Sequence, residues 1–435
     1  MWSKNVALVV LGMLLGWLGT TLSQGPSAAT PEAPDRDALY QQTVEALEHP
    51  DFTERTVLVV NLLDQVTDEN VEGMFQALQD NVQFTREQET RLIVREMARR
   101  DPQATLDAVL KWPANQAARG VQVTVFEWAR INPVAAREAA LKVGGGDKAN
   151  EGAMRGLAYG WAYGRKPGLS EYIRSLPGKM GPGSQKMEFT VIQAAEILRH
   201  DGDQALLDWA LEQAQHEDLD WAKLVVSQSM NALGAKKPES GAAFLEQYWS
   251  EPGASVGIEW LAERWATRDP QAAIAWAKTL PSSGQAQIRG MYYAWQAWEA
   301  RAPFEAKAWL ASAEAGPYLD GAVAARVDSI KRTDPPGAMA AALDIENSEF
   351  RRAVQITTLE WWFTLHQKNT EAWLAENPQP AVIVAEARDR SEVRKKKKVR
   401  LDAVSFLAEQ EQHLLNPLAG ETSAARRSRL GVRRR

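Results

Sequence analysis

The stretch Trp265-Ala-Thr-Arg-Asp-Pro-Gln-Ala-Ala-Ile-Ala-Trp-Ala-Lys-Thr-Leu-Pro281 decides the fold of this chain, because its pattern recurs along most of the sequence. The clear copies centre on Pro102, Pro133, Pro167, Pro238, Pro270, Pro303 and Pro335, and two degenerate copies centre on Asp203 and Thr370. Neighbouring centres are 31 to 36 residues apart. A period near 34 is typical of stacked helical hairpins, each of which buries its apolar face against the next.

Each copy combines the chemistry of a helix end with that of a helix start. Arg268 falls in the last turn of the first helix, where a cation complements the helix dipole. Asp269 predicts an N-cap, and Pro270 fits the first helical position, where a missing N–H costs nothing. The small side chain of Ala273, one turn later, allows the two helices to approach closely. Pro281 then ends the second helix.

The composition agrees with a helical array. The chain has 435 residues, of which 45% are hydrophobic and 24% charged, so it can bury a continuous core. We find no convincing strand pattern, and most of the 17 tryptophans recur at helical spacing, which indicates core filling. The sequence therefore predicts an all-α fold, an α-solenoid of about nine helix-turn-helix repeats of 31–36 residues over 91–387. Residues 37–90 are expected to form an N-terminal helical cap or divergent repeats.

The N-terminus has the pattern of an export or anchoring segment. Lys4 precedes an uncharged apolar run over 6–22, which reaches the lower length limit of a membrane-spanning helix. A polar linker rich in Pro and Ala follows over 23–36. Two alternatives remain open: an uncleaved anchor over 1–22, or a signal peptide cleaved after Ala29. Both place the body outside the cytoplasm, in the bacterial periplasm, with the anchor in the inner membrane.

The C-terminal residues 388–435 are strongly basic, although the whole chain has a net charge of -6. We predict a helical or disordered tail here. Such a block favours an anionic partner, and an acidic membrane surface or glycan fits an exported protein better than nucleic acid does. A solvated tail without a partner is the alternative. The candidate partner-binding residues are Arg394, Lys395, Lys396, Lys397, Lys398 and Arg400.

The sequence offers no clear catalytic or metal-binding motif. It contains no cysteine, which excludes disulfides, thiol catalysis and Cys-ligated metals. The five histidines form no HExxH pair, and the run His200-Asp-Gly-Asp203 falls where a turn between helices belongs. We therefore expect no cofactor, no metal and no enzymatic activity. A pair of carboxylates for glycoside cleavage is the one catalytic arrangement that inspection leaves open.

The second helix of the best copy resembles the second half of a tetratricopeptide repeat. Ala273, Trp276, Leu280 and Pro281 match the Ala, aromatic, Leu and terminal Pro of that family. The first helix departs from the family, because the Leu-Gly pair is missing and Trp265 lies near its end. The resemblance covers roughly 91–378 and implies a superhelical scaffold that holds peptides or partner proteins in a groove. It implies no catalytic residue.

Three classes of function follow from these patterns. The favoured one is a non-enzymatic scaffold or adaptor, tethered to the membrane or exported, that binds a protein or peptide partner in the bacterial cell envelope. The alternative is a glycan-active or peptidoglycan-associated periplasmic protein with an α-superhelix. RNA binding by repeats of similar length is the third class, and the sequence pI near 5.6 argues against it.

Overall fold

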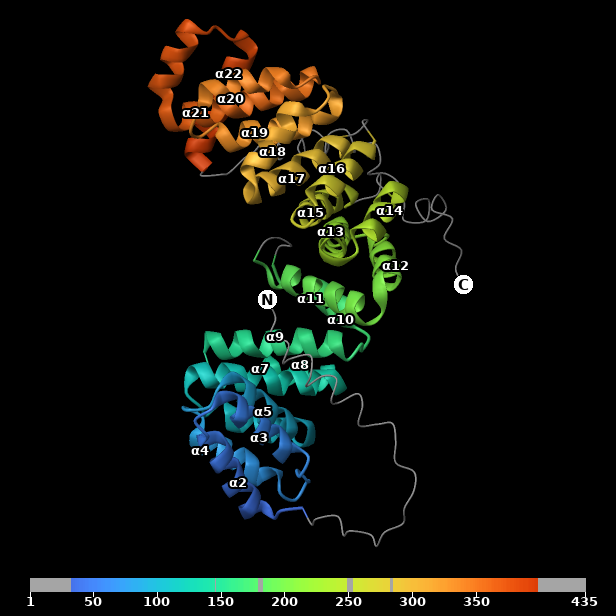
Figure 1. The fold of residues 1–435 in the computed structure, drawn as a ribbon, viewed down its shortest axis with the longest axis vertical. Coiled ribbons are helices and arrows are strands. Elements are labelled where there is room, and N and C mark those ends of the chain that lie inside the picture. The colour runs from blue at the N-terminus through green and yellow to red at the C-terminus, as the bar shows by residue number, and fades with distance from the viewer. Residues whose placement is uncertain (1–32, 145, 179–182, 249–252, 282–284, 398–435) are drawn as a thin grey trace. The chain divides into compact units, whose positions relative to one another are not determined.

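The computed structural model describes residues 33–144, 146–178, 183–248, 253–281 and 285–397, and within them the chain is all-helical (Figure 1). These residues form 21 α-helices and two short 3-10 helices, with no strand among them. The prediction of an all-α fold is therefore confirmed. The predicted segment 1–22 lies outside the described residues, and none of the described helices is long and apolar enough to span a membrane.

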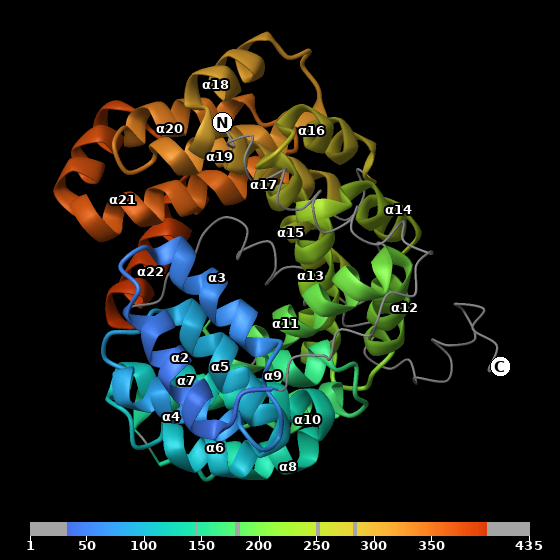
Figure 2. The ribbon, with the colours of Figure 1, turned by 60° about the horizontal axis from the view of Figure 1, so that its bottom comes forward.

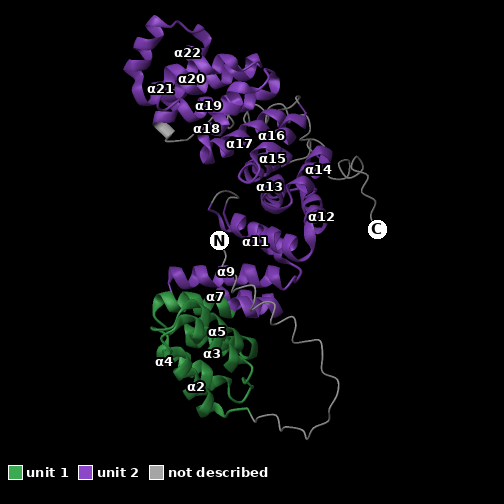
Figure 3. Ribbon diagram, viewed as in Figure 1, with its two compact units in different colours: residues 1–124 green, residues 125–435 purple. Residues whose placement is uncertain are grey.

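The chain divides into two compact units, residues 1–124 and 125–435 (Figure 3). Helix α7 (Ala114–Ile131) contains the point of division. The other helices of the first unit occupy the stretch where a cap and the first repeat are predicted. They are α2 (Arg36–Glu48), α3 (Phe52–Leu63), α4 (Val71–Asn81), α5 (Glu87–Arg100) and α6 (Pro102–Val109).

The second unit continues the alternation of first and second hairpin helices. Its α-helices are α8 (Pro133–Ala140), α9 (Asp147–Tyr163), α10 (Leu169–Ser175), α11 (Gln185–His200), α12 (Gly202–Ala214), α13 (Leu219–Lys236), α14 (Pro238–Tyr248), α15 (Ala254–Ala266), α16 (Pro270–Thr279), α17 (Ala286–Arg301), α18 (Pro303–Ser312), α19 (Asp320–Ile330), α20 (Pro335–Ala341), α21 (Ser348–Glu376) and α22 (Ala381–Lys397). Two 3-10 helices, η1 (Pro317–Leu319) and η2 (Ala342–Asp344), flank α19 and α20.

The corner between the two helices of a hairpin has a recurrent backbone shape. Asp269 has φ −137° and ψ 87°, and its carboxylate accepts a 2.9 Å hydrogen bond from the N–H of Ala272. Asp101 and Asn132 have nearly the same angles and make the same cap. Each is followed by a proline at the first helical position. The N-cap and first-turn assignments made from the sequence are correct at these corners.

The last corner lies earlier than the sequence predicts. Helix α21 contains one residue with non-helical angles, His366 at φ −142° and ψ 54°, close to those of Lys237, which precedes Pro238 at another corner (φ −143°, ψ 57°). The repeat centre is therefore Gln367, the residue that follows this corner, and the centre predicted at Thr370 is wrong. Thr370 instead donates its hydroxyl to the carbonyl of His366, at 3.0 Å. The prediction failed because glutamine replaces the proline that marks most of the other corners.

A small side chain is buried one turn after most of the centres. At this position the second helix lies close to other helices. At Gly241 of α14, a Cβ atom would lie 3.4 Å from Cβ of Leu233 in the first helix of the same hairpin and 2.9 Å from Cδ1 of Leu261 in the first helix of the next hairpin. The buried residues at this position are Thr105, Ala136, Ser170, Gly241, Ala273, Ala306, Ala338 and Thr370. The close helix approach predicted from Ala273 is thus a general feature of the hairpins.

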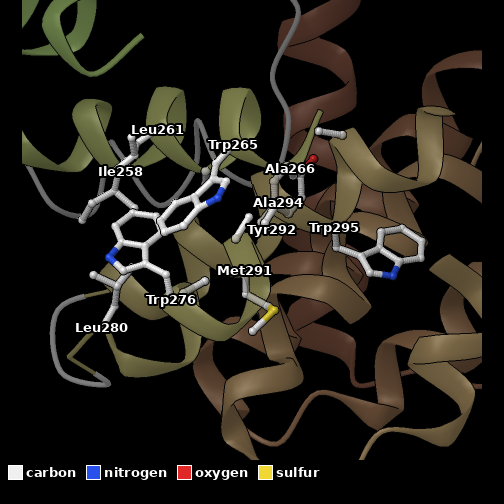
Figure 4. Close-up of a cluster of buried hydrophobic side chains, with 14 of the residues drawn as sticks. Ile258, Leu261, Trp265, Ala266, Trp276, Leu280, Met291, Tyr292, Ala294 and Trp295 are labelled. Atoms are coloured by element: carbon white, nitrogen blue, oxygen red, sulfur yellow. The ribbon is translucent and has the colours of Figure 1, made fainter. Parts of the chain in front are cut away.

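In four hairpins, an aromatic ring of the first helix contacts an aromatic ring of the second helix, within one turn of the small buried residue. Trp265 of α15 packs on Trp276 of α16 with ring centroids 5.8 Å apart, and both side chains are buried (Figure 4). One partner lies near the end of the first helix and the other lies within the second. The same sequence spacing and contact occur in the pairs Trp161–Tyr172, Trp298–Trp309 and Trp362–Trp373. These tryptophans fill the core, as their helical spacing predicts.

The first helices of successive hairpins in the second unit pack on one another. Helices α9, α11, α13, α15, α17 and α19 form a continuous layer in chain order, and α10, α12, α14 and α16 lie on one side of it (Figure 2). Backbones approach closely within the layer. A Cβ atom on Gly321 of α19 would lie 2.2 Å from the carbonyl oxygen of Ile288 in α17, so glycine is required there.

Substitution of Ala273 by arginine tests the close packing at the small buried position. Ala273 is fully buried, so Ala273→Arg places a long charged side chain where two helices touch. We expect the free energy of unfolding to fall by about 2–4 kcal/mol, measured by thermal or urea denaturation. Ala275→Arg, at an exposed position of the same helix, is the control and should change it by less than about 0.5 kcal/mol. Equal effects of the two substitutions would contradict this register.

The corner at His366 gives a second prediction. Since His366 already has the angles found before proline at the other corners, Gln367→Pro should be tolerated. We expect unchanged or slightly higher stability, by up to about 1 kcal/mol, because proline restricts the unfolded chain. Leu365→Pro, just before the corner and inside the helix, should cost about 3 kcal/mol. Thermal melting of both variants checks this, and a severe loss with Gln367→Pro would show that no corner exists there.

Candidate functional site

The basic residues proposed as a tail lie partly in a packed helix. The predicted boundary at Arg388 falls inside α22, which packs along α21 (Figure 1). Arg394 is only 8% exposed, and its Nε lies 2.7 Å from Oε1 of the fully buried Glu360. Lys395 contacts Glu392 at 2.8 Å, and Lys396 and Lys397 lie in the last turn of the helix. Lys398 and Arg400 lie outside the described residues.

The contact between Arg394 and Glu360 is part of the fold. Burial raises the pKa of Glu360 above its usual range, and the positive charges of Arg394, Arg390 and Lys331 act in the opposite direction. A buried carboxylate needs such compensation, since removal of one partner leaves an isolated charge in the interior. Arg394 thus neutralises Glu360 between α21 and α22.

Further polar contacts join the first helices of neighbouring hairpins. The guanidinium of Arg289 in α17 forms an ion pair with Glu259 of α15, and both side chains are largely buried. From the same helix, the hydroxyl of Tyr292 donates to Asp328 of α19 at 2.6 Å, and Lys331 contacts the same carboxylate at 2.6 Å. These contacts fix the register of adjacent helices within the layer, so this part of the unit is a rigid support for residues on its surface.

A row of rings crosses three successive first helices, and we call it the aromatic row. It consists of Phe126 of α7, Tyr163 of α9 and His200 at the end of α11. The ring centroids of Phe126 and Tyr163 are 5.6 Å apart, and those of Tyr163 and His200 are 5.1 Å apart in an edge-to-face arrangement. Arg199 adds a cation, with its Cζ 5.3 Å from the centroid of Tyr163. The aromatic row is therefore continuous across three hairpins.

The aromatic row remains accessible to solvent. Tyr163 is 40% exposed, and the side chains of Arg199 and His200 are 50% and 32% exposed. Aromatic and arginine side chains that are held in place yet exposed can bind another protein at little entropic cost. One turn before Tyr163, Tyr159 of the same helix is 41% exposed and widens the apolar surface. This surface is the candidate binding site.

Sequence reasoning missed the aromatic row. The sequence indicates only a turn at His200, and α12 does begin just after it, at Gly202. The signal was present, however, because Phe126, Tyr163 and His200 follow one another at an equal spacing close to one repeat length. Residues separated by one repeat length become neighbours in the layer.

Other parts of the described chain provide weaker candidates for a functional site. None of its His, Asp and Glu residues gather in a group that could hold a metal ion. A surface depression of about 580 Å³ lies over the last corner, lined by Leu365, His366, Gln367, Lys368, Asn369 and Glu371. Its lining residues come from one continuous segment and are largely exposed, so it has no converging buried polar groups of the kind that hold a small ligand.

Comparison with known proteins adds no assignment. No family model matches the chain, and neither the curated proteins nor the solved structures contain a significant match to it.

The Arg394–Glu360 contact predicts a stability effect that depends on both partners. Arg394→Met leaves Glu360 buried without its nearest counter-charge, and we expect a loss of about 3–5 kcal/mol in unfolding free energy. Replacement of both residues by methionine should recover much of that loss, because no charge is then buried. Urea denaturation of the single and double variants measures the coupling. Lys395→Met on the exposed side of α22 is the control, and a loss as large as that of Arg394→Met would refute the assigned role.

Proposed function

We propose that this protein is a non-enzymatic scaffold with tetratricopeptide-like repeats, which binds a protein or peptide partner through the aromatic row. The observation that carries the proposal is the row of ring contacts Phe126–Tyr163–His200, in which Phe126 is half-buried and Tyr163 is exposed, with Arg199 beside it. Exposed rings at the surface of a rigid helical layer are the kind of anchor that dominates protein interfaces. The succession of helical hairpins supports the solenoid architecture in this proposal.

The cellular setting is part of the same proposal. The apolar run 6–22, which lies outside the described residues, acts as an anchor in the bacterial inner membrane or as a cleaved signal, with the body in the periplasm. The basic residues from Lys395 onward provide a second contact, to an anionic membrane surface or glycan. Arg394 takes no part in that contact, because it is engaged with Glu360.

The glycan-active alternative gains little from the site geometry. A general acid for glycoside cleavage needs a raised pKa and access to the substrate. Glu360 has a raised pKa, but it is fully buried against Arg394 and cannot meet a glycan. Glu360 is therefore not a candidate for the general acid that this alternative requires.

The experiment is an affinity purification from detergent-solubilised membranes, with mass spectrometry and then titration of the purified partner. We expect the wild-type chain to retain one or two stoichiometric proteins. Tyr163→Ala and Arg199→Ala should each weaken binding about tenfold or more, because each truncates an anchor of the aromatic row. Circular dichroism should show the helical fold intact in both variants.

A matched control distinguishes binding through the aromatic row from nonspecific hydrophobic binding. Phe304, at the start of α18, is 89% exposed and belongs to another part of the array. Phe304→Ala should leave partner binding unchanged. The proposal fails if no protein is retained, or if Phe304→Ala weakens binding as much as Tyr163→Ala.

A further inference from the structure

Basic residues recur at the ends of the first helices. In five hairpins a lysine or arginine stands two positions before the proline of the corner, and these residues are Arg100, Arg165, Lys236, Arg268 and Arg301. The carboxyl end of a helix carries partial negative charge, which explains why a cation is favourable there. The position alone therefore identifies no binding site, and the partners of each side chain decide whether its charge is available.

The partners of these five side chains change along the chain. The two arginines nearest the N-terminus each contact a carboxylate at 2.7 Å, Asp68 in one case and Asp201 in the other. Lys236, Arg268 and Arg301 are exposed, and none of them forms an ion pair with another described residue. The same helix position thus carries a neutralised cation early in the array and an unpaired cation in three successive later hairpins.

Two exposed arginines in these hairpins are held by uncharged groups. The guanidinium of Arg268 donates to the backbone carbonyl of Ala235, near the end of α13. One turn earlier, on α15, the Nε of Arg264 donates to Oδ1 of Asn231 at 2.6 Å. Because a carbonyl oxygen accepts a hydrogen bond without adding a negative charge, both arginines are oriented and keep their full charge. The basic edge, as we call this surface, consists of Lys236, Arg264, Arg268 and Arg301.

Two acidic residues near these corners are engaged with other groups. Asp269 caps α16 by accepting from the N–H of Ala272. The hydrogen bond from Ser240 and the nearby charge of Lys237 both lower the pKa of Asp203, and Lys237 is left out of the basic edge for that reason. Within the described part of the chain, neither carboxylate forms an ion pair with a residue of the basic edge.

The basic edge continues the aromatic row along the same layer. Tyr163 and His200 are the last residues of α9 and α11, and Lys236 is the last residue of α13. The first helices pack in chain order (Figure 2). A hydrogen bond from Ser240 to Asp203 also joins the corners that follow α11 and α13. Exposed rings and unpaired cations therefore follow one another along the ends of neighbouring helices.

On the basis of the function proposed above, we propose that the partner of the aromatic row carries an acidic peptide segment, which binds the basic edge in an extended conformation. Packed helices lie about 8–10 Å apart, and an extended chain advances about 3.3 Å per residue. Aspartates or glutamates placed about three to eight residues beyond the group that meets His200 therefore reach the cations of α13, α15 and α17.

An acidic peptide fits this surface better than an anionic membrane does. The cations follow one another from helix end to helix end, and the exposed rings precede them along the same direction. A peptide with an apolar part and an acidic part matches that order, whereas a lipid surface has no order of this kind. The planar fork of an arginine binds a carboxylate through two parallel N–H groups. Each exposed ion pair contributes little alone, so several pairs in register determine the choice of partner.

The test is a selection of peptides from a displayed random library, with the full chain in detergent as the bait. Peptides of about twelve residues are long enough to extend from α9 to α17. We expect the wild type to enrich peptides that have an aromatic residue and, about three to eight positions from it, two or more acidic residues. Vesicles of phosphatidylglycerol serve as a separate probe for a membrane.

Variants distinguish the basic edge from the aromatic row. A chain with both Lys236→Gln and Arg268→Gln should still enrich aromatic residues but lose the preference for acidic ones. Tyr163→Ala should lose the aromatic preference instead. In anisotropy titrations of the best wild-type peptide, each single glutamine variant should weaken binding about threefold and the double variant about tenfold. Added salt should weaken wild-type binding in the same way.

The matched control is Arg100→Gln. It removes a cation at the same helix position, but one that is paired with Asp68, so it should bind the peptide like the wild type. Circular dichroism should show the helical fold intact in all variants, because the substituted residues of the basic edge are exposed.

The possible results separate this proposal from the proposed function. No enrichment of acidic peptides by the wild type, an acidic preference that persists in the double variant, or binding of vesicles alone overturns the role of the basic edge and leaves the aromatic row as proposed. Unchanged peptide binding by Tyr163→Ala, with loss in the double variant, has the opposite meaning: the aromatic row fails and the basic edge stands.

Discussion

The close packing of most hairpins depends on a small side chain one turn after the repeat centre. Ala273 and its counterparts are fully or almost fully buried, and a Cβ atom at Gly241 would lie 2.9 Å from Leu261 in the first helix of the next hairpin. This close approach brings rings of the first and second helices into contact, as Trp265 and Trp276 show. It also leaves the first helix free to pack on its neighbours in the next hairpins. A larger side chain at this one position would disturb the hairpin and the layer together.

The regular part of the fold could be predicted from the sequence because the corner is a local structure. An Asp or Asn cap followed by proline specifies the backbone angles at Asp101 and Asn132 without help from distant residues. His366 adopts the angles of Lys237, the residue before Pro238, although no proline follows it. There the buried Thr370 and the ring contact between Trp362 and Trp373 hold the hairpin, and the ring contact joins two helices. Local sequence rules cannot predict a corner that is fixed by packing.

The candidate sites were harder to predict, because their residues meet across about one repeat length. Glu360 and Arg394 are separated in this way, and so are Phe126 and Tyr163. A local pattern compares residues within one helix, and by that pattern Arg394 is one more charge in a basic run. A comparison of residues that are one repeat length apart pairs Arg394 with Glu360. The offset varies with loop length, and only the structure fixes it for each pair.

Repeat architecture explains how a binding surface can form on the hairpins without disturbing their core. Each hairpin contacts mainly its neighbours, so a substitution on its surface leaves distant hairpins undisturbed. The helices α7, α9 and α11 carry the aromatic row. Farther along the layer, buried pairs such as Arg289 with Glu259 hold the helices in register. The array thus separates residues that maintain its register from residues that are available to partners, and that separation lets a scaffold acquire binding sites without loss of its fold.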